Sequence, residues 1–198
     1  TITASSLNTL DTYTTGVINA ATVTTLTGTA AEIIHLFIGP GLVGIIGLGN
    51  EAITVTGTIT VAQFNTIAAS TTGVITATIS EGDMSSLNAI TEAGNALTIT
   101  VTDASVAASD LNTLDGRTTV AVDAATVTTL TGKTAELNTA YTAYAAGTII
   151  GLGNEAVTIS DTTIDAALLI TLDAHTSGII DASSISTLTG SDADKETV

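Results

Sequence analysis

Acidic and amide side chains recur at matching places along the chain, and they are the residues best suited to bind a metal ion. Carboxylate and amide oxygens on turns are the ligands that Ca²⁺ prefers in proteins. The candidate calcium ligands are Asp11, Asp115, Asp123, Asp173 and Asp181, and Asn19 stands at the place of Asp123 and Asp181 in the first copy of the pattern. The same side chains also cap turns and helices by hydrogen bonding to nearby backbone. Because no EF-hand loop and no glycine-rich calcium nonapeptide is present, the structural role is favoured and calcium stays an alternative.

A glycine-rich segment imitates a nucleotide-binding fingerprint. The run Gly47-Leu48-Gly49-Asn50-Glu51-Ala52 follows an apolar stretch and has the spacing G-x-G-x-x-A. That site needs a helix N-terminus directly after the glycines to hold the pyrophosphate. The next residues, 53–58, are instead β-branched and alternating, so the glycines are predicted to form a tight turn that opens a strand.

Threonines alternate along two segments, at Thr54, Thr56, Thr58 and Thr60, and at Thr98, Thr100 and Thr102. A flat array of threonines on one face could order water and bind ice. The equivalent of the first run, at 158–164, contains Asp161 and breaks the pattern. Threonine is also ordinary on the solvent side of a strand, and that interpretation is favoured.

Catalytic groups are scarce. His35 and His175 are the only histidines, they stand at different places in the two copies, and the chain has no cysteine. His35, beside Ile34 and Leu36, is predicted at the edge of the core, and His175 at a helix C-terminus, where the helix dipole favours it. No enzymatic function is expected.

The chain is built from repeats. Ala20–Gly28 recurs unchanged as Ala124–Gly132, and Ile45–Ala52 recurs as Ile149–Ala156, both displaced by 104 positions. A shorter unit starts near Leu10, Ile67, Leu114 and Leu172. Displacement by one constant offset indicates tandem duplication, which is typical of solenoids. We therefore expect a first long repeat at 1–104 and a second at 105–198, joined in one continuous solenoid.

Composition and charge narrow the functions. The chain has 198 residues, of which 44% are hydrophobic but only 3% aromatic, and its formal net charge is −16. Small branched side chains suit a core of stacked coils. Nucleic acid and anionic membrane surfaces need Lys and Arg to neutralise phosphate, so neither is an expected partner. No run approaches the roughly 20 apolar residues of a membrane span, so no membrane insertion is expected.

Periodicity predicts strands and short helices in alternation. Segments 53–56, 97–101 and 156–160 have the period-2 pattern of half-buried strands. Helices are predicted around Leu137, Tyr141 and Tyr144, after the capping box Thr29-Ala30-Ala31-Glu32, and at 62–69, 85–93, 107–115 and 165–174. In the second copy Lys133 replaces Thr29, and the capping box is expected to be lost. The predicted fold class is a repeat solenoid of parallel β-strands with short helices in each coil, as an α/β-solenoid or a pure β-solenoid.

The segments 108–115, 122–132 and 151–161 resemble the repeats of very large surface proteins of marine cyanobacteria, some of which are linked to swimming motility. The resemblance covers nearly the whole chain. It implies secretion, a cell-surface or filament location and a sea-water setting. The stretch 33–42, with Phe37 and Pro40, departs from the usual repeat sequence and is a candidate interaction site that is specific to this protein.

These observations predict a non-enzymatic extracellular structural protein, in which stacked coils form a rod within a surface layer, filament or adhesin. Its expected partner is itself, through end-to-end contacts, and no cofactor is expected beyond calcium. Because repeats run to both ends without polar capping repeats, we expect a piece of a longer array or a protomer covered by its neighbours. The alternatives are a ligand-binding solenoid for calcium, glycan or ice, and a phage fibre segment.

Overall fold

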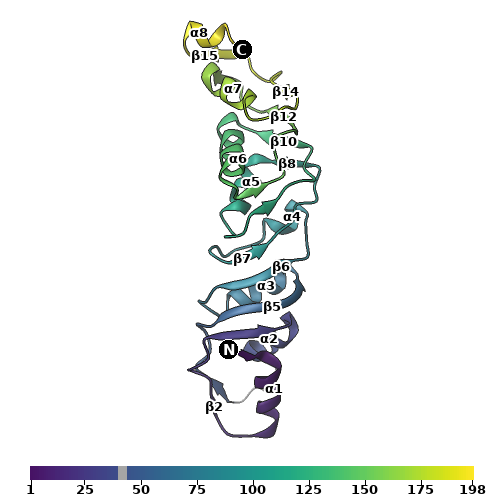
Figure 1. The fold of residues 1–198 in the computed structure, drawn as a ribbon, viewed down its shortest axis with the longest axis vertical. Helices are drawn as coiled ribbons and strands as arrows, with labels where there is room; N and C mark the ends of the chain where they lie inside the picture. Colours follow the sequence, from purple (N-terminus) through teal and green to yellow (C-terminus); the bar gives the residue numbers. More distant parts are fainter. Residues whose placement is uncertain (40–43) are drawn as a thin grey trace. The chain divides into compact units, whose positions relative to one another are not determined.

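The computed structural model describes residues 1–39 and 44–198, which form two compact units. Unit 1 comprises Thr1–Glu81, Ala89–Ile99 and Arg117–Val120, and unit 2 comprises Gly82–Asn88, Thr100–Gly116 and Ala121–Val198. Each unit is an α/β structure in which parallel strands alternate with short helices (Figure 1). This confirms the coarser part of the predicted fold class. The repeat boundary between residues 104 and 105 is a different division, and it stays a prediction.

In its described residues, unit 1 contains one five-stranded parallel sheet and three helices. The sheet has the order β1 (Ile2–Thr3), β3 (Thr25–Gly28), β5 (Ala52–Ile59), β6 (Ile75–Ile79) and β7 (Ala96–Thr98), and β2 (Ile18–Asn19) pairs with β4 (Ile45–Ile46). The helices are α1 (Ala4–Tyr13), α2 (Ala30–Ile38) and α3 (Val61–Ala68). Helix α2 packs against both α1 and α3, so the helices pair in chain order, as the main strands do.

The core of unit 1 follows from alternation along the strands. Leu26, Ile53 and Ile75 are direct neighbours in register and are buried. The residues that follow them, Thr27, Thr54 and Thr76, are also in register but point to the opposite face, because successive side chains of a strand alternate. Identical apolar types therefore stack on one face, and hydroxyl side chains stack on the other.

Unit 2 has the same plan. Its main parallel sheet has the order β14 (Ile180–Asp181), β12 (Ala156–Ile159), β10 (Thr129–Gly132) and β8 (Ser105–Ala107). Two further pairs are β9 (Val122–Asp123) with β11 (Ile149–Ile150), and β13 (Thr163–Asp165) with β15 (Thr187–Thr189). The helices are α4 (Met84–Leu87), α5 (Ala108–Asp115), α6 (Thr134–Ala146), α7 (Ala166–Asp173) and α8 (Asp192–Lys195).

Most predicted segments overlap an element of the expected type, namely the strands at 53–56, 97–101 and 156–160, the helices at 62–69, 107–115 and 165–174, and the helix around Leu137, Tyr141 and Tyr144. The bounds differ by up to three residues, because β5 runs on to Ile59, β7 ends at Thr98 and α6 begins at Thr134. The helix expected at 85–93 is wrong in length, because α4 ends at Leu87. Ile90 is buried, but it lies in an irregular segment after the helix. Helices α1 and α8 were not predicted. No helix in the described ranges is long and apolar enough to cross a membrane.

The helix start after Thr29 forms the predicted capping box. The backbone N–H of Thr29 donates to Glu32 Oε2 at 2.8 Å, and the N–H of Glu32 donates to Thr29 Oγ1 at 3.3 Å. In the second copy the expected loss is only partial, because the N–H of Lys133 still donates to Glu136 Oε2 at 3.0 Å. The lysine side chain cannot accept a hydrogen bond, so only one half of the box is absent.

Candidate functional site

The candidate calcium ligands on the strands close turns. Asp123 Oδ1 accepts from the N–H of Ala125 at 3.0 Å, and Asp181 Oδ1 accepts from the N–H of Ser183 at 2.9 Å. Asn19 Oδ1 makes the same contact with the N–H of Ala21 at 3.0 Å. A side-chain oxygen bonded to the backbone two residues later is an Asx turn. Asp123 and Asp181 therefore have the turn-capping role that the sequence favours, and an amide serves as well as a carboxylate.

The other three candidates lie on helices. Asp11 is within α1, while Asp115 and Asp173 are the last residues of α5 and α7. Asp115 Oδ2 accepts from Thr148 Oγ1 at 3.0 Å. Among the residues that the structure describes, no three of His, Cys, Asp and Glu lie close enough to hold one metal ion. The structure thus does not bring the five aspartates together into a shared cage, and calcium binding remains a hypothesis.

The Asx turn at Asp181 predicts a dependence of stability on pH. Hydrogen bonds from the hydroxyl and the backbone N–H of Ser183 hold the pKa of Asp181 below its ordinary value of 3.8. A carboxylate with a lowered folded-state pKa stabilises the fold above the unfolded pKa, and this contribution is lost as the pH falls through the folded pKa. In Asp181→Asn we expect the melting temperature to fall less with acidification below pH 3.8 than in the parent.

The measurement is the melting temperature from circular dichroism across an acid series. Asp173→Asn is the control, because it removes one carboxylate from the last residue of α7 instead of from an Asx turn. Equal acid sensitivity of Asp181→Asn and the parent would contradict the prediction. At neutral pH both variants should melt like the parent, since Asn19 closes its turn with an amide.

Other acidic side chains stabilise helix N-termini. Glu81 Oε1 accepts from the N–H of Val61 at 3.1 Å, and Asp103 Oδ2 accepts from the N–H of Met84 at 2.7 Å. Asp161 Oδ2 accepts from both the N–H and Oγ1 of Thr134, at 2.7 and 2.8 Å. The first N–H groups of a helix have no partner within the helix, and the helix dipole favours negative charge there. Several of the acidic side chains therefore stabilise the fold by capping helices.

The glycine-rich turn is closed by a buried carboxylate and not by a cofactor phosphate. Glu51 is fully buried, and its Oε1 and Oε2 accept from the N–H of Gly49 at 3.0 and 2.9 Å. In the second copy, Glu155 Oε2 accepts from the N–H groups of Gly153 and Asn154 at 2.8 and 3.1 Å. Strand β5 follows directly, so the prediction of a turn that opens a strand is confirmed. A pyrophosphate would meet a carboxylate instead of free N–H donors.

A threonine side chain that the sequence analysis did not identify bonds to the backbone carbonyl of each of these glutamates and to the N–H two residues after itself. This arrangement is called the threonine clip. Thr71 Oγ1 donates to the carbonyl of Glu51 at 2.8 Å and accepts from the N–H of Gly73 at 3.0 Å. Thr176 does the same between Glu155 and Gly178, at 2.9 and 3.0 Å. Thr14 and Thr118 accept the equivalent N–H two residues later. Threonine at the fourth position after Leu10, Ile67, Leu114 and Leu172 is the signal that identifies these clips.

The only aromatic stack recorded in the described residues joins Tyr141 of α6 to His175, whose ring centroids lie 5.5 Å apart at 11°. Tyr141 is 1% exposed and Glu155 is 2% exposed, and neither Tyr141 Oη nor Glu155 Oε1 has a hydrogen-bond partner in the structure. Burial, followed by the proximity of Glu155, raises the pKa of Tyr141 well above its usual range. His175 follows α7, as predicted, whereas His35 is exposed on α2, so its predicted place at the core edge is wrong.

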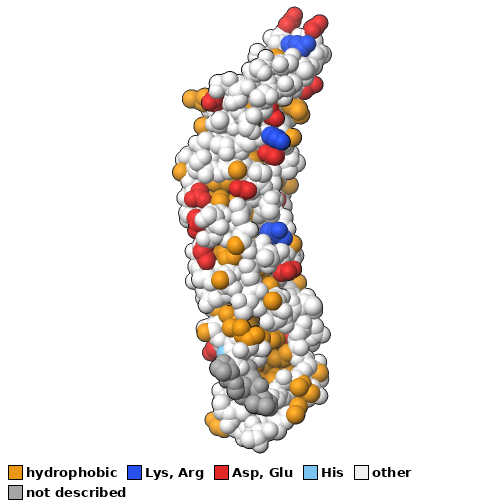
Figure 2. Space-filling view, turned by 180° about the vertical axis from the view of Figure 1, so that it is seen from behind, with side chains coloured by type: hydrophobic (Ala, Val, Ile, Leu, Met, Phe, Trp, Pro, Cys, Tyr) orange, Lys and Arg blue, Asp and Glu red, His pale blue; other side chains and the backbone are white. Residues whose placement is uncertain are grey.

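The predicted threonine runs are exposed. Thr54, Thr56, Thr58 and Thr60 in unit 1 all face solvent, as does Thr98 on β7. On the face displayed in Figure 2, charged side chains are sparse and most of the surface is neither charged nor apolar. Hydroxyl side chains are thus available on an ordered sheet, which is the geometry that ice or another regular surface would need.

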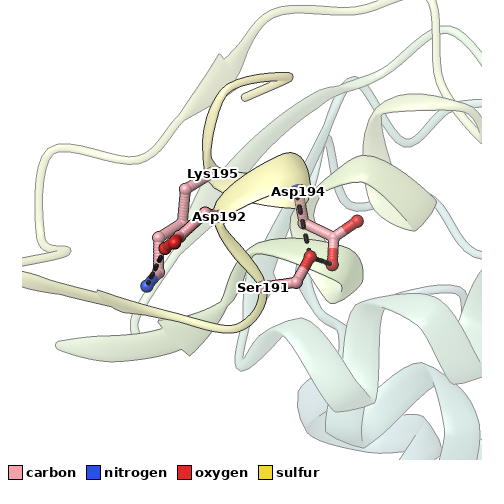
Figure 3. Close-up of polar contacts among 4 residues, drawn as sticks. All are labelled: Ser191, Asp192, Asp194 and Lys195. Atoms are coloured by element: carbon pink, nitrogen blue, oxygen red, sulfur yellow. Dashed lines mark hydrogen bonds and ion pairs between the residues drawn. The ribbon is translucent and has the colours of Figure 1, made fainter.

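The last helical turn of the chain, α8, is capped by Ser191, whose Oγ accepts from the N–H of Asp194 at 3.2 Å (Figure 3). Lys195 Nζ lies 3.6 Å from Asp192 Oδ1. Exposed ion pairs contribute only about 0–1 kcal/mol, so the cap and the packing of α8 against α7 hold this turn in place.

Unit 1 also contains a pocket of about 510 Å³, lined by the turns at 68–75 and 92–95 with Gly49. Its buried polar side chain, Asn95, already accepts from the N–H of Ile75 at 2.8 Å. The turns that line the pocket are therefore stabilised by hydrogen bonds within the protein.

Comparison with known proteins gives no further identification: no protein-family model, no curated protein and no solved structure matches this chain.

Proposed function

We propose that the chain is a non-enzymatic, extracellular structural protein whose repeats stack as the coils of a solenoid within a surface layer, filament or adhesin. The resemblance to cyanobacterial surface-protein repeats, the constant offset of 104 residues and the in-register stacking of equivalent apolar residues support this proposal. In this proposal, coil-on-coil burial is the interaction that builds the assembly, and the acidic surface favours a saline setting.

The observation that carries the proposal is an apolar side chain that is exposed to solvent in one repeat, while its equivalents in the other repeats are buried. Leu10 of α1 is 46% exposed, whereas the equivalent Leu114 is 1% exposed, and Ile67 and Leu172 are also buried. Helix α3 packs against α2, and α7 packs against α6. Within the described residues, α2 is the one helix recorded as packing against α1. A further coil beside α1 would cover Leu10 as α2 lies beside α3 and α6 lies beside α7. Leu114 is buried on α5 although α6 is the one helix recorded as packing against α5 in the described residues, so the covering coil need not present a helix.

The last repeat also has apolar side chains that are less buried than their equivalents in earlier repeats. Leu188 of β15 and Ile185 before it are half-buried, whereas the equivalents of Leu188, Leu26 and Leu130, are fully buried. Burying one such side chain stabilises contact by about 1.5–3 kcal/mol. We infer that another repeat of the same type covers these positions, supplied either by further repeats of a longer chain or by a second copy.

A substitution at Leu10 tests this proposal. The parent protein is expected to self-associate with rising concentration, and Leu10→Glu is expected to remain monomeric, because a charge at that position cannot be buried without a partner. Leu168→Glu is the matched control: Leu168 is 44% exposed on α7, at a place where other repeats carry Ser6, Gln63 and Asp110. Light scattering after size exclusion measures the mass of all three proteins.

Electron microscopy across a dilution series, first with calcium and then with chelator, decides the form of the assembly. Filaments with an axial repeat of one protomer would support end-to-end stacking, and their loss in chelator would assign the aspartates to metal sites. A parent protein that stays monomeric at every concentration would contradict self-assembly. Equal association of the parent and the Leu10→Glu variant would contradict the assignment of Leu10 to the contact.

A further inference from the structure

The outward face of the unit 1 sheet carries two rows of threonine that are aligned by strand pairing. In the first row Thr27, Thr54 and Thr76 are direct neighbours on β3, β5 and β6. In the second row Thr58, Thr78 and Thr98 are direct neighbours on β5, β6 and β7. These six residues are called the threonine face. Five of them are exposed and Thr27 is half-buried, so the rows lie at the surface.

The hydroxyls of the threonine face are free and their orientation is restricted. Among the described residues no protein group hydrogen bonds to any of these six hydroxyls. In unit 2, by contrast, Thr131 Oγ1 contacts the carbonyl of Val106 at 3.4 Å. A β-branched side chain on a strand has few rotamers, so both the hydroxyl and the methyl group of each threonine repeat at fixed places. Each row therefore offers hydrogen bonds and apolar contact at regular intervals across the strands.

The spacing of this lattice follows from the sheet. Neighbouring strands lie about 4.8 Å apart, and residues two apart along a strand, such as Thr76 and Thr78 on β6, are separated by about 6.6 Å. On β5 the register shifts between Thr54 and Thr58, which are four positions apart, so each row is regular within itself and the second spacing holds on β6 alone. Ice presents rows of oxygen atoms at closely similar intervals along the crystal surface, and liquid water has no fixed interval. We propose that the threonine face binds ice, its hydroxyls replacing oxygens of the lattice and its methyl groups holding the first water layer in order.

Charge is absent from the strands that carry the face. Strands β1, β3, β5, β6 and β7 contain no Asp, Glu, Lys or Arg, although the chain as a whole has a net charge of −16. A charged side chain holds its own hydration shell and would break the ordered layer. An uncharged surface suits ice binding, and the strands of the threonine face provide one although the chain as a whole is acidic.

Unit 2 provides an internal comparison. Its row in the same register position reads Ala107, Thr131, Thr158 and Asp181. The alanine is no difference, because Ala96 is the neighbour of Thr76 in unit 1, but the carboxylate of Asp181 places a charge beside the hydroxyls. Thr158, which stands 104 positions after Thr54, is exposed like Thr54 but has Asp181 as its neighbour. Ice binding is therefore assigned to unit 1 alone.

The test measures partition of the protein into slowly growing ice, together with inhibition of ice recrystallisation. The parent is expected to enter ice in preference to serum albumin, and the double variant Thr54→Lys, Thr78→Lys is expected to lose that preference. Thr158→Lys is the matched control and should behave like the parent. All are made in the Leu10→Glu background, which is expected to be monomeric, so that failure of self-assembly and failure of ice binding are distinguishable.

If the lysine variant does not fold by circular dichroism, the double variant Thr54→Val, Thr78→Val replaces it, because valine keeps the shape and removes only the hydroxyls. It too is expected to show weaker partition than the parent. A parent protein that enters ice no more than albumin would overturn the proposal. Equal loss in the Thr158→Lys control, or retention on crystalline polysaccharide without any effect on ice, would also overturn it.

Discussion

Gly178→Ala is expected to lower the free energy of unfolding by about 3 kcal/mol, because an added methyl group has no space at this position. The new Cβ would overlap the carbonyl oxygen of Glu155 and lie 2.5 Å from its carbonyl carbon. Gly178 does not have a left-handed backbone, so the whole effect is steric. Urea unfolding followed by circular dichroism measures the loss.

The backbone around Gly178 cannot move aside without breaking the threonine clip. Thr176 Oγ1 donates to the same carbonyl of Glu155 at 2.9 Å and accepts from the N–H of Gly178 at 3.0 Å. Relief of the overlap would therefore lengthen two hydrogen bonds, each with a net contribution of about 1 kcal/mol. Gly73→Ala is expected to have the same effect in unit 1, since it meets the backbone of Glu51 in the same way.

Gly116→Ala is the matched control. Gly116 has φ −67° and ψ −10°, which alanine adopts freely, and the nearest atom to an added Cβ lies 3.4 Å away. We expect a change within about 0.5 kcal/mol. If Gly178→Ala were as stable as Gly116→Ala, the close approach to Glu155 would not constrain the fold.

Periodicity alone was sufficient to predict most helices and strands. Leu137 and Tyr141 stand one turn apart, and both are buried on α6. Ile53 and Val55 alternate with exposed threonines, as a half-buried strand requires. Such patterns are local, and each repeat displays them again, so independent copies support the same element. The error at 85–93 arose because Ile90 has helical spacing but is buried from outside a helix.

The hydrogen-bonding partners could not be predicted from local patterns. The side chain of Asp161 caps Thr134, which lies 27 positions away, and Glu81 caps Val61 at a distance of 20 positions. These pairings depend on which turn lies over which helix N-terminus, and this is a property of the tertiary structure. Asp123 and Asp181 have the turn-capping role that the sequence favoured, whereas Asp11, Asp115 and Asp173 lie on helices.

The burial of Glu51 and Glu155 was the least expected feature. Glutamate is almost never fully buried unless it is paired, and the chain has only three Lys and Arg residues. Backbone N–H groups of the glycine-rich turn bond to both oxygens of Glu51 and to Oε2 of Glu155 instead. Glycine allows this because Gly49 and Gly153 have φ +128° and +116°, which brings their N–H groups onto the acidic side chain.

Glu155→Ala is expected to destabilise the protein by about 1–3 kcal/mol, because a donor that is left without its acceptor costs free energy in proportion to its burial, and the two donors here are part-buried. Two donors, the N–H groups of Gly153 and Asn154, lose their acceptor in this variant. Glu155→Gln keeps a carbonyl oxygen for both donors, so we expect most of the stability to return. Urea unfolding of the two variants measures the difference. Glu92→Ala, at an exposed position, controls for loss of one negative charge and should change stability by about 0.5 kcal/mol or less.

The glutamine variant also distinguishes the acceptor role of Glu155 from its charge. Glu155 Oε1 and Tyr141 Oη are both buried without partners, and the amide group of glutamine supplies a donor that the carboxylate lacks. If charge itself held the turn, Glu155→Gln would be as unstable as Glu155→Ala, which would contradict the prediction. Tyr141→Phe should be tolerated in either case, because it removes an unpaired hydroxyl, and Phe37 stands at the equivalent position of the first copy. The turn is therefore expected to depend on one acceptor oxygen between two N–H donors.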